Sequence, residues 1–168
     1  IFGWRPEIHP DVNSYFSGSK IAWLLGSVSG AYEKAVNDQI KFGTIDTYLL
    51  WKLTDGKVHA TDYTNASRTM IYNIYDLCWD EELLNILDIP KNILPNVLDS
   101  NAIFGYATGL SDIDEDFKEV PIASIIGDQQ ASLFGQCCFE QGDAKNTYGT
   151  GCFMLMNTGS TPCESNNG

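Results

Sequence analysis

VPIASIIGDQQASLFGQ, residues 120–136, is the stretch from which the fold class of this chain can be argued. Its first eight residues form a short apolar run, which predicts a buried strand over 120–127. The polar residues that follow predict a helix over 128–142 that ends at a glycine. A strand that leads into a helix at a Gly-Asp step is typical of open α/β sheets, whose ligand sites lie at strand carboxyl ends beside helix N-termini. We therefore predict an α/β fold with a candidate site at this step.

The rest of the chain supports this layout. Apolar spacing predicts helices over 19–36, 44–56 and 79–90, and Asp80 is placed to cap the last of them. A strand is expected over 101–108. Residues 62–69 are interpreted as a polar connection, and the large apolar side chains expected in the core are Trp23, Trp51, Trp79, Phe104 and Phe134. Helices come first and strands then alternate with helices, which is an α/β order.

Composition excludes several kinds of partner. The 168 residues carry a formal net charge of −12, so nucleic acid and anionic membrane surfaces are not expected to bind. No apolar run approaches the length of a membrane span. The five cysteines are odd in number and contain no CxxC pair, which favours reduced thiols in a cytoplasmic protein. The two histidines show no spacing typical of a metal site.

A glycine-rich turn occurs in NTYGTGCFMLMNTG, residues 146–159. Gly149 and Gly151 flank Thr150, and glycine lets another molecule approach the backbone closely. Successive N–H groups in such a turn can form a concavity that binds an anion, for example a phosphate. Taken alone, however, the stretch is explained better by a plain hairpin turn between two strands.

Asp128 also has two interpretations. It could be a simple N-cap, because aspartate is among the commonest capping residues. It could instead be a base or a metal anchor at the mouth of a sheet, with Gln129 beside it to orient a hydroxyl-rich ligand. An acid at one strand end and a Gly-Thr-Gly turn about twenty residues later together suit phosphoryl transfer to an alcohol. No GxSxG, HExxH, Walker A or dinucleotide fingerprint is present.

Several longer blocks resemble the FGGY carbohydrate kinases, and within them the members that act on glycerol. The blocks follow the order of that family and lie within residues 14–168: 15–25, 42–70, 88–97, 127–136 and 144–159. The resemblance implies an actin-like, ribonuclease H-like α/β fold. It places residues 1–142 in the N-terminal, substrate-binding domain and 143–168 at the start of the C-terminal, nucleotide-binding domain.

The resemblance also implies roles for single residues. Asp128 matches the catalytic base, which takes the proton from the glycerol hydroxyl that attacks the γ-phosphate of ATP, and it would lie near Mg²⁺. Gln129 and Tyr15 match residues that hydrogen-bond glycerol, and Phe153 matches an aromatic ring that packs against the carbons of glycerol. Gly149, Thr150 and Gly151 match the turn that binds the phosphates of ATP.

Parts of the family pattern are missing from this sequence. They include an N-terminal phosphate loop, an arginine-glutamate pair that holds glycerol, and the adenine-binding half. We therefore expect these residues to be an internal piece of a longer protein, inactive alone. The resemblance implies that the complete protein is a homo-oligomer (dimer or tetramer). Residues 111–119 contain no arginine or histidine, so no inhibition by fructose 1,6-bisphosphate is expected. Alternatives are another FGGY kinase of the xylulose or gluconate type, or a non-catalytic actin-like binding module.

Overall fold

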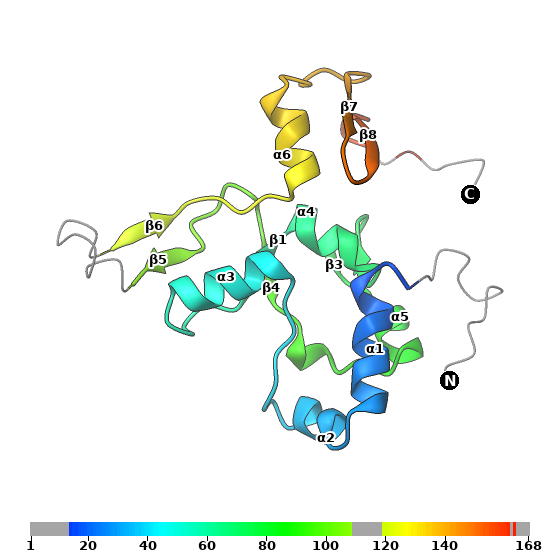
Figure 1. Cartoon of the computed structure of the whole chain (residues 1–168), viewed down its shortest axis with the longest axis vertical. Coiled ribbons are helices and arrows are strands. Elements are labelled where there is room, and N and C mark those ends of the chain that lie inside the picture. Colours follow the sequence, from blue (N-terminus) through cyan, green and yellow to red (C-terminus); the bar gives the residue numbers. More distant parts are fainter. Residues whose placement is uncertain (1–13, 109–118, 162, 164–168) are drawn as a thin grey trace. The chain divides into compact units, whose positions relative to one another are not determined.

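The computed structural model describes residues 14–108, 119–161 and 163, and the chain divides after Ile125 into two compact units (Figure 1). The helices of the first unit are α1 (Ser17–Ser27), α2 (Ala31–Val36), α3 (Ile45–Leu53), α4 (Tyr63–Ala66) and α5 (Glu81–Ile86), with the 3₁₀ turns η1 (Ser67–Thr69) and η2 (Lys91–Ile93). Its strands are β1 (Ala60–Asp62), β2 (Tyr72–Asn73), β3 (Cys78–Trp79), β4 (Asn96–Leu98), β5 (Gly105–Ala107) and β6 (Val120–Ile122). The second unit contains α6 (Asp128–Gly135), β7 (Ala144–Tyr148) and β8 (Cys152–Met156).

The prediction of one helix over 19–36 is wrong, because the chain forms α1 and α2 there. Val28 is already extended after α1, with φ −94° and ψ 120°. Gly30 precedes α2 in the left-handed conformation, with φ 75°. Glycine adopts this conformation without the steric cost that a Cβ atom would bring, so the chain turns here rather than continuing the helix.

The helix ends with local sequence signals were predicted correctly. The Asp80 carboxylate accepts a hydrogen bond from the backbone N–H of Leu83 at 3.0 Å, so Asp80 caps α5 as expected. Helix α3 stops just before Asp55 and Gly56, which have φ of 53° and 74°. Both helices are nevertheless shorter than the predicted ranges, since the flanking residues form turns and the short strand β3.

In the part of the first unit that the structure describes, the strands form three pairs. Strands β1 and β4 are parallel, with Thr61 opposite Val97. Strands β2 and β3 are antiparallel, and so are β5 and β6, where Tyr106 lies opposite Pro121. The predicted strand over 101–108 is therefore confined to β5.

The prediction of a buried strand over 120–127 is wrong in two respects. Only β6 is a strand, and Ile126 remains 39% exposed. After β6, the N–H of Ile125 donates to the Ser100 carbonyl at 3.1 Å, but residues 123–127 form no ladder with the described part of the chain. An apolar run is buried only when neighbouring strands cover it, and the run itself does not determine those neighbours.

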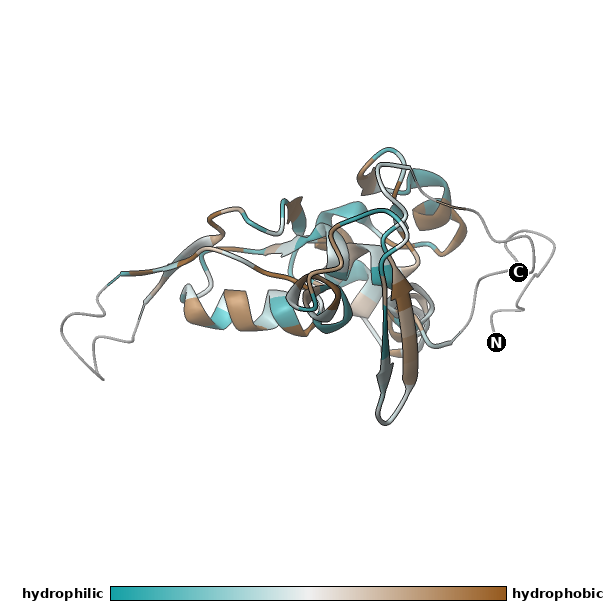
Figure 2. Ribbon diagram, turned by 90° about the horizontal axis from the view of Figure 1, so that it is seen from above, coloured by the Kyte–Doolittle hydropathy of each residue, from teal (hydrophilic) through white to brown (hydrophobic). Residues whose placement is uncertain are grey.

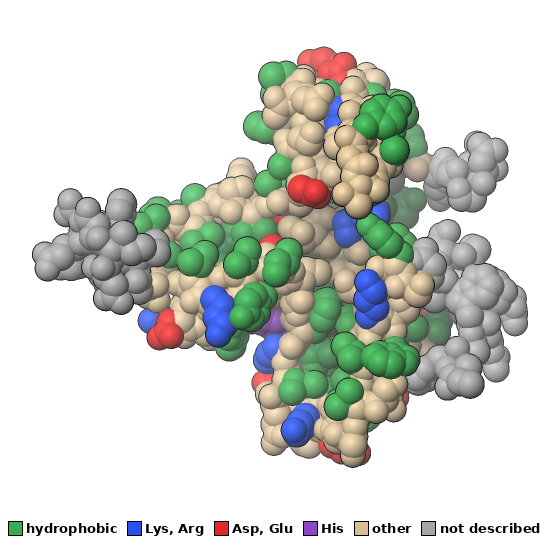
Figure 3. All heavy atoms as spheres, in the orientation of Figure 1, with side chains coloured by type: hydrophobic (Ala, Val, Ile, Leu, Met, Phe, Trp, Pro, Cys, Tyr) green, Lys and Arg blue, Asp and Glu red, His purple; other side chains and the backbone are tan. Residues whose placement is uncertain are grey.

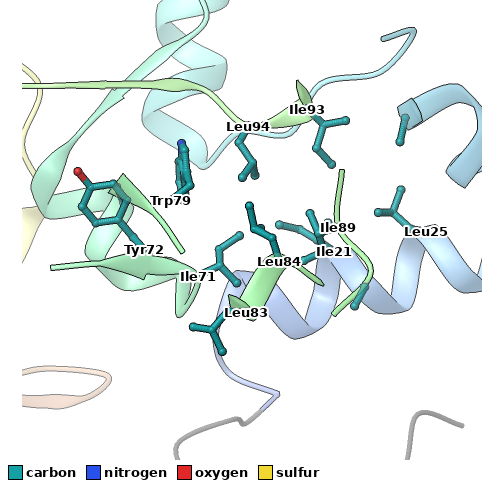
Figure 4. Close-up of a cluster of buried hydrophobic side chains, with 13 residues drawn as sticks. Ile21, Leu25, Ile71, Tyr72, Trp79, Leu83, Leu84, Ile89, Ile93 and Leu94 are labelled. Atoms are coloured by element: carbon teal, nitrogen blue, oxygen red, sulfur yellow. The ribbon is translucent and has the colours of Figure 1, made fainter. Parts of the chain in front are cut away.

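The larger core lies between α1, α5 and the β2–β3 pair (Figure 4). Its labelled side chains point into one cluster: Ile21, Leu25, Ile71, Tyr72, Trp79, Leu83, Leu84, Ile89, Ile93 and Leu94. Trp79 is anchored there by a hydrogen bond from its Nε1 to the Pro95 carbonyl at 2.9 Å. A smaller cluster gathers around Leu50, Ala60 and Phe104.

Three of the five expected core aromatics lie outside the core. Trp23 is 61%, Trp51 37% and Phe134 68% exposed, whereas Trp79 and Phe104 are buried as predicted. Other hydrophobic side chains, drawn in green, also reach the visible surface (Figure 3). Hydrophobicity alone therefore does not predict burial in this chain, because much of any protein surface is apolar.

The prediction of a polar connection over 62–69 is also wrong, because these residues form the end of β1, then α4 and η1. Asp62 is fully buried at the end of β1, and its carboxylate caps α4 by accepting from the N–H groups of Thr64 and Asn65 at 3.1 and 3.0 Å. It also accepts from the Thr64 and Ser100 hydroxyls, both at 2.6 Å, and from the Asn65 amide at 2.7 Å. Burial alone would raise the pKa of this carboxyl, but these hydrogen bonds outweigh burial and hold its pKa below its ordinary value. Asp62 thus ties the end of β1 to the segment that follows β4.

The second unit is a helix packed against a β-hairpin. Strands β7 and β8 pair antiparallel, with Thr147 opposite Phe153, which confirms the predicted strand–turn–strand. Figure 2 shows that β8 is strongly hydrophobic and β7 is hydrophilic. Helix α6 is shorter than the predicted 128–142, because Cys137 takes a left-handed conformation with φ 57° just after the helix ends. In the described residues of both units, no helix has the length and apolar character needed to cross a bilayer.

Candidate active site

The second unit brings most of the predicted site residues together. Asp128 and Gln129 begin α6, and the glycine-rich turn and Phe153 belong to the hairpin against which α6 packs. Tyr15 lies in the first unit before α1, where its side chain is 66% exposed and its carbonyl accepts from Lys20 Nζ at 2.9 Å. Tyr15 belongs to the other compact unit, so its contribution to the same site stays a prediction.

Asp128 is the first residue of α6 rather than its cap. Gly127 occupies the N-cap position, with φ −64° and ψ 143°. The Asp128 carboxylate is exposed, and it accepts from the backbone N–H of Gln129 at 2.8 Å and from the Gln129 side-chain amide at 3.3 Å. A carboxylate offers about four lone-pair positions, and these two contacts use half of them. Asp128 therefore keeps acceptor capacity for a ligand hydroxyl or a metal ion, and the positive end of the helix dipole favours its charge.

Lys145 is a residue of this site that the sequence analysis missed. It lies in β7 and is only 3% exposed. Its ammonium group donates to Oε1 of Gln129 and, at 2.8 Å, to the hydroxyl of Thr147. Lysine is almost never fully buried unless it has partners, so this contact network is a specific feature of the unit. No local sequence signal distinguishes Lys145 from an exposed strand lysine.

The two faces of the hairpin differ in burial. Lys145, Thr147, Phe153 and Leu155 are buried or half-buried, and their face includes the contact of Lys145 with α6. The opposite face is exposed: Asn146, Tyr148, Met154 and Met156. The two methionines on this face are 72% and 53% exposed. Phe153 thus belongs to the covered face, and Gln129 of α6 contacts that face through Lys145.

The glycine-rich turn closes tightly over this face. The N–H of Gly149 donates to the Gly151 carbonyl at 3.0 Å. A Cβ atom on Gly151 would lie 2.6 Å from Cε2 and 3.0 Å from Cζ of the Phe153 ring, so the ring can approach only because residue 151 is glycine. A Cβ atom on Gly149 would have open space, since its nearest neighbour is 4.0 Å away. The turn is the hairpin connection that the sequence favoured, and it also leaves Thr150 exposed at its tip.

Asp128 is the candidate ligand for a divalent cation among the described residues of this unit. Among the described residues, no group of three or more histidine, cysteine, aspartate or glutamate side chains lies close enough together to hold a metal ion. Mg²⁺ bound with a nucleotide usually takes one or two carboxylates together with phosphate oxygens and water. The free acceptor positions of Asp128 fit that mode of binding, and a dedicated protein cage is not required.

Comparison with known proteins defines the class. Residues 7–135 match the sequence profile of the FGGY family of carbohydrate kinases, N-terminal domain, and the chain belongs to this family. Among curated relatives, the chain is 63% identical over 157 residues to a glycerol kinase of Petrotoga mobilis and 59% identical to one of Fusobacterium nucleatum. These alignments cover 94% of this chain and 31% of each relative, so the chain spans about a third of the length of the curated relatives it matches.

Solved structures agree with this assignment. A crystal structure of Plasmodium falciparum glycerol kinase with ADP matches with a TM-score of 0.82 and 39% identity, over 89% of this chain and 29% of that chain. A xylulose kinase of Lactobacillus acidophilus matches with a TM-score of 0.68 at 24% identity, over 83% of this chain and 27% of that chain, which supports the fold alone. The predicted actin-like α/β fold is thereby confirmed. The proposed domain boundary between residues 142 and 143 stays a prediction.

Proposed function

We propose that the complete protein containing this chain transfers the γ-phosphate of ATP to glycerol, giving sn-glycerol 3-phosphate in glycerol catabolism. The observation that carries the proposal is the presence of Asp128 with free acceptor positions in the same compact unit as the Gly-Thr-Gly turn. The high identity to glycerol kinases supports glycerol over other acceptors. Mg²⁺, a cytoplasmic location and a homo-oligomeric state belong to the same proposal.

The chemistry needs a base and a hydroxyl-orienting group side by side. In the proposed step, the Asp128 carboxylate accepts the proton of a glycerol hydroxyl. The hydroxyl oxygen forms its new bond to the γ-phosphorus, and the bond from that phosphorus to the ADP oxygen breaks. The second amide hydrogen of Gln129 can donate to the attacking oxygen, because the first is directed at Asp128. A positioned base typically accelerates such a reaction about 10²–10⁴-fold.

The remaining groups bind and orient the substrates. Backbone N–H groups around Thr150 would contact the phosphates of ATP, and a bound Mg²⁺ would neutralise their developing charge. Phe153 would supply an apolar wall for the C–H face of glycerol, and Tyr15 a further hydroxyl. Residues 111–118, on which the expected lack of fructose 1,6-bisphosphate inhibition depends, lie outside the described residues. Measuring glycerol phosphorylation by the complete protein with and without fructose 1,6-bisphosphate would test that expectation.

The test of this function is a substrate panel. ADP release by the complete protein should be measured with ATP, Mg²⁺ and glycerol, erythritol, xylulose or gluconate. We expect glycerol to give the highest kcat/KM. A higher kcat/KM for another acceptor would mean that the protein is an FGGY kinase with a different substrate. Binding of glycerol without any turnover would favour a non-catalytic binding module.

Gly151→Ala is expected to raise the KM for glycerol about tenfold. The added Cβ would displace the Phe153 ring, and overpacking of this kind costs about 1–3 kcal/mol. Gly135→Ala is the matched control, because its Cβ would have open space at the end of α6 in the same unit, and it should leave this KM nearly unchanged. Steady-state kinetics with glycerol as the varied substrate would measure both. Equal effects of the two substitutions would contradict the proposed contact of Phe153 with glycerol.

A further inference from the structure

We propose that Lys145 is a positioning residue that holds the Gln129 amide in one of its two orientations, with its NH₂ group toward Asp128. This inference rests on the proposed function, in which Asp128 is the base and Gln129 binds the acceptor hydroxyl. The inference explains why a charged lysine is buried here. Lys145 is shielded from solvent, and it forms no ion pair with a carboxylate of the described residues.

The argument begins with the ambiguity of a glutamine side chain. The amide oxygen and nitrogen are nearly equal in shape, so packing alone does not fix which one faces a given neighbour. A lysine ammonium group has three donors and no acceptor. Because Nζ of Lys145 contacts the Gln129 amide, the atom facing Lys145 must be the oxygen Oε1.

The consequence appears on the other side of the amide. With Oε1 directed at Lys145, Nε2 is directed at the Asp128 carboxylate, and it lies 3.3 Å from Oδ2. The flipped amide would place an oxygen against the carboxylate oxygen, and two acceptors repel each other. In the observed orientation Gln129 is a donor toward Asp128 and toward a hydroxyl beside it. An alcohol bound there could donate its proton to Asp128 while its oxygen accepts from Gln129.

The position of Lys145 is itself fixed by the hairpin. Its Nζ also donates to Thr147, which lies on the same face of β7, at 2.8 Å. Thr147 pairs across the ladder with Phe153, so the lysine is attached to the strand pair that carries the glycine-rich turn. The contact with Gln129 therefore links the start of α6 to the hairpin. Burial at 3% exposure shields this charge from water and strengthens its hydrogen bonds.

A double-mutant cycle in the complete protein tests the role. Lys145→Met keeps the length of the side chain and removes its charge, and we expect kcat with glycerol to fall about 10–100-fold, as for loss of a charge-assisted hydrogen bond. Gln129→Ala should cause a loss of similar size. The two losses should not multiply in the double variant, because both remove the same interaction. Lys57→Met, at an exposed position in the first unit, should stay within about twofold of wild type.

Gln129→Glu provides a second test that does not depend on the folding of Lys145→Met. It keeps an oxygen for Lys145 but replaces the NH₂ donor toward Asp128 with an acceptor, so we expect the same 10–100-fold loss in kcat, and the melting temperature shows that the variant is folded. The role of Lys145 would be overturned if Gln129→Glu turned over glycerol as fast as the wild type, or if the losses in the cycle were fully multiplicative. Neither result would affect the proposed function, as long as the wild-type protein phosphorylates glycerol. Absence of glycerol turnover by the wild type would overturn both.

Discussion

Asp128→Asn in the complete protein is expected to lower kcat for glycerol phosphorylation by about 10²–10⁴-fold, the usual contribution of a positioned general base. Asparagine keeps the shape of the side chain and one oxygen for the Gln129 N–H, so α6 should form normally. An amide cannot take up the hydroxyl proton, and it also presents a donor where the carboxylate accepts. The loss should therefore appear in kcat, while glycerol binding measured by calorimetry changes little.

Asp99→Asn is the matched control for this substitution. Asp99 is exposed in the first unit, and the same chemical change there should leave kcat unaltered. Retention of more than a tenth of wild-type kcat by Asp128→Asn would contradict the assignment of Asp128 as base. A loss confined to binding, with kcat unchanged at saturating glycerol, would give Asp128 a substrate-binding role only.

Asp62→Ala is expected to lower the free energy of unfolding by about 2–4 kcal/mol. The substitution removes the cap of α4 and leaves donors from Thr64, Asn65 and Ser100 without their acceptor inside the first unit. The midpoint of urea unfolding of the complete protein would measure the change. Asp99→Ala, an exposed aspartate in the same unit, should change stability by less than about 0.5 kcal/mol.

The effect of Asp62 should also depend on pH. Since the folded pKa is lowered from its ordinary value, the carboxylate contributes its full stability above the unfolded pKa of about 4. That contribution is lost as pH falls through the folded pKa. The difference in stability between wild type and Asp62→Ala should therefore be constant from pH 6 to about pH 5 and shrink in more acidic solution. A difference that grew with acidity would mean that the hydrogen bonds do not favour the charged form.

Local signals in the sequence predicted much of the secondary structure. The cap at Asp80, the stop at Asp55-Gly56 and the hairpin around Thr150 each depend on residues within a few positions of one another. The break at Gly30 was not predicted, since one helix was expected over 19–36. Whether a glycine bends a helix depends on the packing of both flanks, and this packing is not written in the local sequence.

Features that depend on distant segments could not be predicted. Asp62 was interpreted as part of a polar connection. Its burial involves a hydrogen bond from Ser100, which lies 38 residues away and cannot be inferred from the local sequence. The apolar run after β6 was interpreted as a buried strand because its composition is that of one. Lys145 was missed because its partner Gln129 comes from α6, and only the packing of α6 on the hairpin brings the two side chains together.

The family resemblance and the local chemistry contributed different parts of the site. Residue types alone suggested an acid and a phosphate-binding turn, but left the N-cap and plain-hairpin interpretations open. The structure places Gly127 at the cap position, so Asp128 is not needed there and has acceptor capacity to spare. Gln129 donates to Asp128, and Lys145 donates to Gln129, so the start of α6 carries a connected set of polar side chains.

A crystal structure of the complete protein with glycerol, Mg²⁺ and a non-hydrolysable ATP analogue tests the central claim most directly. We expect one glycerol hydroxyl within about 2.6–3.2 Å of the Asp128 carboxylate, the distance range for a general base. The same structure should place the phosphates at residues 149–151 and the Gln129 amide between Lys145 and that hydroxyl. Glycerol bound away from Asp128, or phosphates away from the Gly-Thr-Gly turn, would contradict the account.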